Sequence, residues 1–197
     1  MWASHVEIAC KSLAPPPGKW HGLEDAEIRY RRRYVDMYSN PQTVRAFEQR
    51  SRIVSLLRRF MEARGYLEVE TPMMQPIAGG AAARPFVTKH NALDMELFMR
   101  IAPELYLKRL MVGGMRKVFE INRNFRNEGV DRSHNPEFTA MEAYEAFGDY
   151  MTMLELVESL VHHVACAMAG CPEGGDGPVL PFGELRIDYR KPFERVR

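Results

Sequence analysis

The stretch from Phe119 to Glu128 alternates apolar and polar residues. Side chains two apart in a strand lie on the same face of the sheet, so this period predicts a strand with one apolar and one polar face. We expect this strand to cover about 117–128 and a second strand to cover about 137–147, with a polar loop between them. The polar face of the first strand carries Glu120, Asn122, Asn124, Arg126 and Glu128. One face of the second carries Phe138, Ala140, Glu142 and Tyr144.

These two faces together offer an anion-binding guanidinium, carboxylates, an aromatic ring and a phenol. We expect five of the side chains to open on one cavity, namely Arg126, Glu128, Phe138, Glu142 and Tyr144. The plain alternative is a solvated sheet face with one aromatic residue, because antiparallel sheets commonly expose one side to water. The alternation by itself leaves both interpretations open.

Helical segments flank these strands. Asn40 followed by Pro41 is typical of a helix start, and Gly65 is typical of a helix end. Between them an apolar stripe recurs at helical steps, at Val44, Phe47, Val54, Leu57 and Met61. We expect further helices over 23–37, 103–111 and 149–169, and shorter strands over 1–13, 66–70, 97–102 and 184–189. Without a regular βαβ rhythm, the expected fold class is α+β, a mostly antiparallel sheet flanked by helices.

Composition excludes some classes of function. The 27 basic and 26 acidic residues leave a net charge of +1, so the bulk charge does not indicate a nucleic-acid binder. Cys10, Cys166 and Cys171 lack a Cys-x-x-Cys spacing, which favours a reduced intracellular protein. No apolar run approaches the roughly 18 residues of a membrane span, and no secretory signal is recognisable. We therefore expect a cytoplasmic protein without a membrane partner.

Several blocks resemble the class II aminoacyl-tRNA synthetases, in the lysyl form of the subclass that also holds the aspartyl and asparaginyl enzymes. The blocks FRNEG at 125–129, HNPEF at 134–138 and MEAY at 141–144 are similar to motif 2. The block RGYLEVETP at 64–72 resembles motif 1. The blocks IAPELYLK at 101–108 and GGA at 79–81 are similar to the lysyl branch. The resemblance runs almost continuously from about Trp20 to Tyr150.

This resemblance implies lysine–tRNA ligation, in which ATP activates lysine to lysyl-adenylate before transfer to tRNA(Lys). Arg126 is then the catalytic residue, because it holds the α-phosphate and stabilises the charge that develops there. The ATP-binding residues implied are Arg126, Glu128, His134, Asn135 and Phe138. The lysine-binding residues implied are Gly80, Glu104, Glu142 and Tyr144. A homodimer formed through motif 1 is also implied.

Other parts of the family pattern have no counterpart in these residues. Nothing between Tyr150 and Arg197 resembles motif 3, and the Mg²⁺ ligands of the family are expected in a C-terminal half beyond it. We expect residues 1–14 to be the end of an OB-fold anticodon-binding domain, and 15–197 to be an incomplete class II catalytic domain. We therefore expect the chain alone to be inactive, whether it is a fragment or a truncated paralogue.

Two alternatives stay open at this point. One is a truncated, catalytically inactive synthetase-like module that binds ATP, lysine or a partner. The other is an aspartyl- or asparaginyl-type enzyme. The carboxylate of Glu142 argues against the latter, because a site for an acidic side chain needs a cation.

Overall fold

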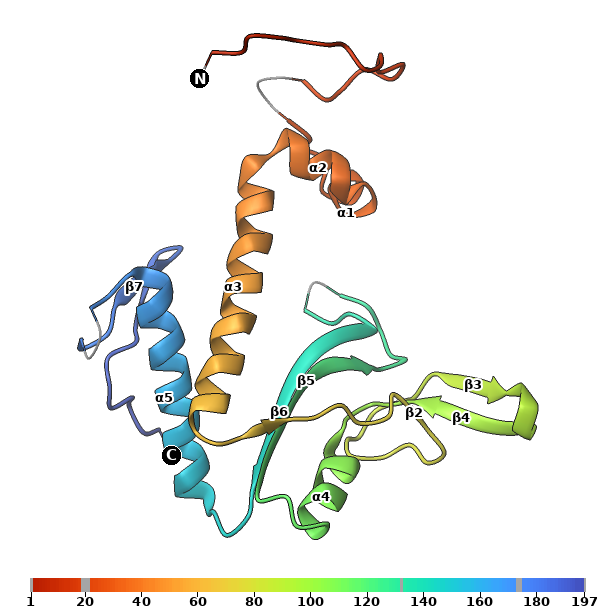
Figure 1. Ribbon diagram of the computed structural model, residues 1–197, viewed down its shortest axis with the longest axis vertical. Helices are drawn as coiled ribbons and strands as arrows, with labels where there is room; N and C mark the ends of the chain where they lie inside the picture. The colour runs from red at the N-terminus through yellow and green to blue at the C-terminus, as the bar shows by residue number, and fades with distance from the viewer. Residues whose placement is uncertain (1, 19–21, 132, 173–174, 197) are drawn as a thin grey trace. The chain divides into compact units, whose positions relative to one another are not determined.

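The computed structural model describes residues 2–18, 22–131, 133–172 and 175–196. Trp20, where the resemblance begins, lies outside these residues. The chain divides into two compact units, Met1–Val54 and Ser55–Arg197. Figure 1 follows the chain through both of them. Within the described residues, no helix is both long enough and apolar enough to cross a membrane.

The first unit contains α1 (Ala26–Arg31), α2 (Arg33–Ser39) and the beginning of α3. The helix expected over 23–37 is thus two helices, since Arg32 leaves helical geometry at ψ 57°. The strand expected over 1–13 is wrong: residues 2–13 form no strand. The physical reason is that a weakly alternating segment needs a neighbouring strand to bond with, and the structure describes none beside it.

The long helix α3 (Pro41–Ala63) confirms the predicted helix and both of its boundaries. Proline occupies its first position, where a missing N–H leaves no hydrogen bond unmade. After the helix, Gly65 takes the left-handed conformation at φ 78° and lets the chain turn. This helix therefore ends by local sequence chemistry.

In the described part of the second unit, α3 is followed by three sheets, two α-helices and one 3-10 helix. The first sheet has the order β1-β5-β6, with β1 (Leu67–Glu68) parallel to β5 (Lys117–Phe125), and β5 antiparallel to β6 (Glu137–Glu145). The second has the order β2-β4-β3, antiparallel throughout, from β2 (Met74–Gln75), β4 (Met95–Met99) and β3 (Val87–His90). The third pairs β7 (Val179–Phe182) with β8 (Leu185–Asp188). The remaining elements are the 3-10 helix η1 (Asn91–Leu93), α4 (Glu104–Val112) and α5 (Tyr150–Ala169). These sheets and helices confirm the expected α+β class.

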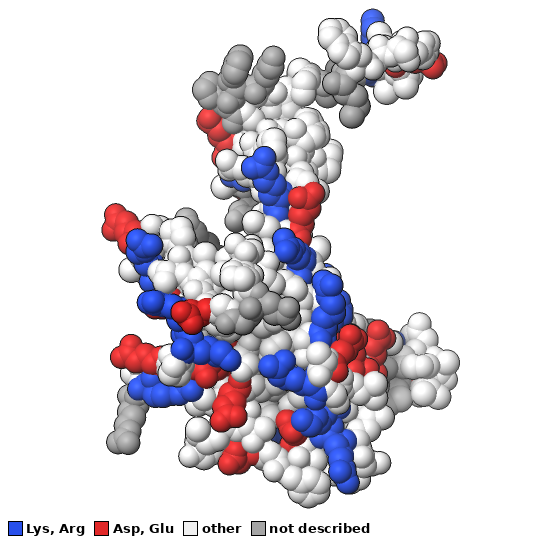
Figure 2. All heavy atoms as spheres, turned by 60° about the vertical axis from the view of Figure 1, so that its left-hand side comes forward, with Lys and Arg blue, Asp and Glu red and all other residues white. Residues whose placement is uncertain are grey.

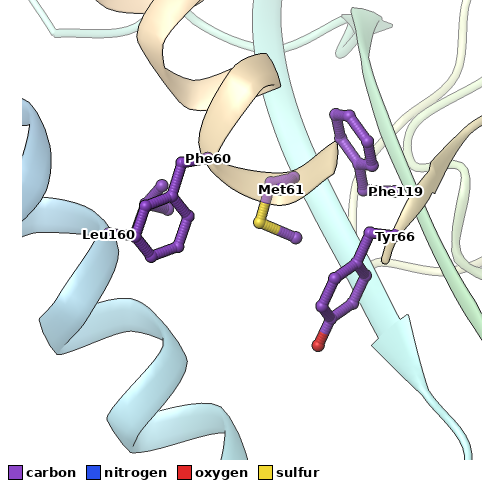
Figure 3. Close-up of a cluster of buried hydrophobic side chains, with 5 residues drawn as sticks. All are labelled: Phe60, Met61, Tyr66, Phe119 and Leu160. Carbon is purple, nitrogen blue, oxygen red and sulfur yellow. The ribbon is translucent and has the colours of Figure 1, made fainter. Parts of the chain in front are cut away.

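One face of the β5–β6 pair is covered by the end of α3 and by α5. The buried cluster drawn in Figure 3 consists of Phe60, Met61, Tyr66, Phe119 and Leu160. Against it pack more apolar side chains from odd-numbered strand positions, Ile121, Met141 and Ala143. The apolar face predicted from the alternation is thus confirmed as the core face. The other face is left for polar side chains and for α4, which contacts both strands.

The helix α5 begins and ends as predicted. Asp149 accepts a hydrogen bond from the Thr152 N–H, and the Thr152 side chain bonds back to the cap, which completes a capping box. Gly170 ends the helix at φ 73°. Two expected strands differ in length or position: the one over 66–70 is only Leu67–Glu68, and the one over 97–102 is Met95–Met99.

Charged side chains of both signs are scattered over the surface drawn in Figure 2. In the first unit, two arginines of the 29–33 run bind Asp36: Arg29 at 2.8 Å and Arg33 at 2.9 Å. Arg31 pairs with Glu27 at 2.7 Å. Of these pairs, Arg29–Asp36 joins α1 to α2, whereas the other two lie within one helix each.

Candidate active site on the β5–β6 sheet

The antiparallel register of β5 and β6 brings the predicted site residues to one sheet face. Asn124 lies opposite Phe138, and Glu120 lies opposite Glu142. Side chains at directly opposed positions point to the same side, so the polar residues of both strands share the face that turns away from the α3–α5 core. The shared polar face is therefore present.

The first strand is shorter than expected, because β5 ends at Phe125. Arg126 and Glu128 lie just beyond it. The Arg126 N–H still donates to the Pro136 carbonyl at 2.8 Å, so the pairing continues for one residue past the strand. The two side chains thus lie where the hairpin loop begins. The alternation had predicted a strand that continues to about residue 128, which is too long.

A cavity of about 560 Å³ lies at this end of the sheet. Its lining residues are Arg126, Glu128, Gly129, Ser133, His134, Asn135 and Phe138. All the residues predicted to bind ATP are among them. Glu142 and Tyr144 are not, so the expectation that five side chains open on one cavity is wrong: two of them lie farther along the same sheet face, towards α4.

The Arg126 side chain carries a positive charge and has one hydrogen-bond donor, Nε, that is not used within the described residues. Its guanidinium carbon lies 5.1 Å from the centre of the Phe138 ring. Its Nε is buried and has no hydrogen-bond partner among the described residues. A buried donor left unpaired costs free energy, so an anion that enters this cavity gains a charge-assisted bond.

Two further contacts shape the cavity. The Glu128 carboxylate accepts the backbone N–H of Arg84 at 3.3 Å, which ties the small-residue loop at 78–85 to the hairpin. On the opposite side, the Asp131 carboxylate contacts Nδ1 of His134 at 2.8 Å. The lining of the cavity therefore comes from a single hairpin, residues 126–138, which the Arg84 contact ties to the loop at 78–85.

The residues predicted to bind lysine form a second group. The Tyr144 hydroxyl donates to the Glu142 carboxylate at 3.0 Å. A Cβ placed on Gly80 would lie 3.1 Å from the Cβ of Glu104, so the Gly80 backbone approaches that side chain closely. The Glu104 carboxylate pairs with the Lys108 ammonium at 2.5 Å.

Electrostatics link these carboxylates. Burial raises the pKa of Glu142 above its usual value; the Tyr144 hydrogen bond opposes this rise, and the Glu104 carboxylate adds to it. Burial also raises the pKa of Tyr144, with the Glu142 charge as the next cause. A cation bound here would relieve the repulsion between the two carboxylates.

Sequence analysis missed a buried ion pair beneath this group. Arg100 and Glu120 are each 1% exposed, and their side chains meet at 2.7 Å. Arg100 also donates to the Thr71 hydroxyl at 3.0 Å and to the Arg123 carbonyl at 2.8 Å. The available signal was a charged residue between Met99 and Ile101, inside an apolar run.

No metal site is formed by the described residues, among which no group of three or more His, Cys, Asp or Glu side chains is placed to hold an ion. The expectation that Mg²⁺ ligands lie elsewhere stays a prediction.

Comparison with known proteins shows the family of the chain. The profile of the family described as tRNA synthetases class II (D, K and N) matches residues 25–197. The chain belongs to this family of class II tRNA synthetases.

Within the family, the chain is similar to curated proteins named lysine–tRNA ligase. It is 56% identical over 196 residues to that of Carboxydothermus hydrogenoformans, which covers 100% of this chain and 39% of the relative. It is 56% identical over 186 residues to the lysine–tRNA ligase of Syntrophomonas wolfei, and the match covers 94% of this chain and 36% of the relative. It is 53% identical to the lysine–tRNA ligase of Salmonella arizonae, and the match covers 98% of this chain and 37% of the relative. The chain thus spans less than two-fifths of the length of these relatives.

Proposed function

We propose that this protein is a lysine–tRNA ligase, and that the β5–β6 sheet face carries its nucleotide and lysine sites. The observation that carries the proposal is the shared face itself. An anion-binding cavity with Arg126 lies at one end, and a carboxylate group with Glu142 lies at the other. The reaction needs both, because a negatively charged phosphate must meet an amino acid with a cationic side chain.

In the proposed reaction, a lysine carboxylate oxygen bonds to the α-phosphorus of ATP while the bond to the pyrophosphate oxygen breaks. Lysyl-adenylate forms; a hydroxyl oxygen of tRNA(Lys) then bonds to the lysyl carbonyl carbon, the bond from that carbon to the phosphate oxygen breaks, and AMP leaves. Arg126 holds the α-phosphate, and its unpaired Nε donates to the charge that develops there. Glu128 accepts a hydrogen bond from the adenine amino group, Phe138 stacks on the purine, and the loop residues His134 and Asn135 contact the phosphates.

At the other end, Glu142 and Tyr144 hold the ε-ammonium of lysine. Glu104 holds the α-ammonium beside the Gly80 backbone, once its pairing with Lys108 gives way. A buried cation needs carboxylates to replace its hydration, and the mutual repulsion of Glu104 and Glu142 supports that role. The same charge disfavours aspartate or asparagine as the substrate, although the family includes such enzymes.

Several parts of the proposal rest on resemblance to the family. Residues 64–72 correspond to motif 1 and 125–144 to motif 2, residues 1–14 to the end of an OB-fold, and 15–197 to part of the catalytic domain. Further proposals are a homodimer through motif 1, Mg²⁺ as the ion that accompanies ATP, and the cytoplasm as the location.

The test is a pair of binding titrations, lysine and ATP separately, on the protein and on Glu142→Gln. The variant keeps the shape of the side chain and removes its charge. We expect lysine affinity to fall by about 2 kcal/mol, roughly 30-fold, as for the loss of a hydrogen bond to a charged group, with ATP affinity unchanged.

Glu137→Gln is the matched control, because Glu137 lies on the same strand, faces away from the site and pairs with Arg123 at the surface. It should leave both affinities unchanged. Equal losses for lysine and ATP in Glu142→Gln, or no loss for lysine, contradict the assignment.

A further inference from the structure

In a tight turn of the β5–β6 loop, the His134 ring is held by one of its two nitrogens. The Asp131 carboxylate accepts the backbone N–H of Ser133 at 2.6 Å and that of His134 at 2.8 Å. The same carboxylate contacts Nδ1 of the His134 ring, with its two oxygens at 2.8 and 2.9 Å. Backbone and ring of His134 are thus fixed by a single side chain.

This contact decides which ring nitrogen carries the proton. The N–H of Ser133 and the His134 side chain lower the pKa of Asp131, so it stays a carboxylate at neutral pH. A carboxylate only accepts hydrogen bonds, so Nδ1 of His134 must carry the hydrogen. In the neutral ring, Nε2 therefore carries no hydrogen and can only accept a hydrogen bond.

The remaining nitrogen belongs to the nucleotide cavity. His134 lines that cavity and its side chain is 73% exposed. Among the described residues, the other charged side chains that line the cavity are Arg126 and Glu128, and Asp131 adds a negative charge behind the ring. A neutral His134 thus presents a lone pair to incoming phosphate oxygens, whereas an imidazolium presents an N–H and balances Asp131.

We propose that Asp131 is a positioning residue for the nucleotide phosphates: it holds His134 by Nδ1, so that Nε2 contacts a phosphate oxygen only after the ring takes up a proton. Binding of a nucleoside triphosphate is then coupled to the uptake of up to one proton from solvent. This inference rests on the proposed nucleotide site and adds a pH dependence to it.

The variant Asp131→Asn distinguishes a role of Asp131 in orienting the His134 ring from a role in holding the turn of the loop. An asparagine oxygen still accepts the backbone N–H groups, so the turn is kept. Its amide also donates, so it stabilises the other neutral tautomer, in which Nε2 bears the hydrogen. The variant should therefore bind ATP without taking up a proton.

The experiment is calorimetry of ATP binding, without lysine, in buffers that differ in ionisation enthalpy. It spans about pH 6 to about pH 8.5, so that any proton taken up on binding is followed on both sides of neutral pH. For the unaltered protein we expect net proton uptake that approaches one at the alkaline end, with affinity falling by up to about tenfold per pH unit there. The variant His134→Gln measures the proton uptake that comes from ATP and from all groups other than His134. The proton uptake of Asp131→Asn should equal that of His134→Gln.

Asp94→Asn is the control, because Asp94 is an exposed carboxylate in the β3–β4 turn and pairs with Lys89. It should keep the proton uptake of the unaltered protein. ATP binding without proton uptake, or with equal uptake in His134→Gln, overturns this inference alone. Failure of the unaltered protein to bind ATP overturns the proposed nucleotide site together with it.

Discussion

Arg100 is the residue on which the site face depends most. Its guanidinium joins the chain after β1, through Thr71, to Glu120 on β5, and it lies under the carboxylates proposed to bind lysine. A buried ion pair is weak evidence for net stability, but removal of one partner leaves an uncompensated charge. The pair therefore matters most when it is broken on one side.

We expect Arg100→Met to lower the free energy of unfolding by about 3–5 kcal/mol, because Glu120 is then buried without its partner. Urea unfolding followed by circular dichroism measures this. Arg123→Met is the control: Arg123 is half exposed and pairs with Glu137 at the surface, so its loss should cost under about 1 kcal/mol. A double variant, Arg100→Met with Glu120→Gln, should recover part of the loss. Equal costs for the two single variants contradict this account.

At the scale of elements, the capping box of α5 fixes the point at which the helix begins after β6. Asp149 satisfies the N–H of Thr152, which the helix itself leaves unpaired. We expect Asp149→Ala to lower the Tm by about 2–4 °C, whereas Asp149→Ser, which keeps a cap, should lower it less. Thermal unfolding distinguishes the two variants. An equal shift in both means that the cap does not stabilise the fold.

The first unit has its own stabilising centre in Asp36, which is fully buried. Burial raises its pKa, but hydrogen bonds from Asn40, Arg29, Thr43 and Arg33 outweigh this and bring the value to about 2. A lowered pKa means that the ionised form stabilises the folded state. This contribution is complete above the ordinary aspartate pKa, 3.8, and is lost as the pH falls towards 2.

We therefore expect α1 and α2 to lose protection in amide hydrogen exchange as the pH falls from about 4 to about 2. Asp36→Asn should weaken the two helices already at neutral pH and abolish this acid step. Glu27→Gln, which removes the partner of Arg31 in an exposed pair, should leave the step in place. An acid step that persists in Asp36→Asn shows that another group is responsible.

For the molecule as a whole, the proposed dimer predicts a concentration-dependent mass. Leu67 on the edge strand β1 is 56% exposed, which fits a surface that a second copy covers. We expect Leu67→Glu to weaken dimerisation at least about tenfold, the effect of roughly 1.4 kcal/mol at an interface.

Sedimentation equilibrium over a range of concentrations tests this. Val112→Glu is the control, because Val112 is 90% exposed at the end of α4, outside the motif 1 segment. It should dimerise as the unaltered protein does. A monomer at every concentration, or equal weakening in both variants, contradicts dimerisation through motif 1.

The amino-acid sequence alone determined the features that depend on neighbouring residues. The alternation from Phe119 placed the core face and the polar face correctly, because successive side chains of a strand point to opposite sides. The boundaries of α3 and α5 followed from Pro41, Gly65, Asp149 and Gly170, since caps are local chemistry.

Only the tertiary structure decided the features that depend on distant partners. β5 ends at Phe125, and the pairing with β6 continues only through the Arg126 N–H, so Arg126 lines the cavity at the loop end of the sheet and Glu142 lies farther along the face. The Arg100–Glu120 pair joins the residue that follows β4 to β5, and no local pattern specifies that approach. The physical reason is that strand register and ion pairing are long-range contacts, which alternation along one segment does not encode.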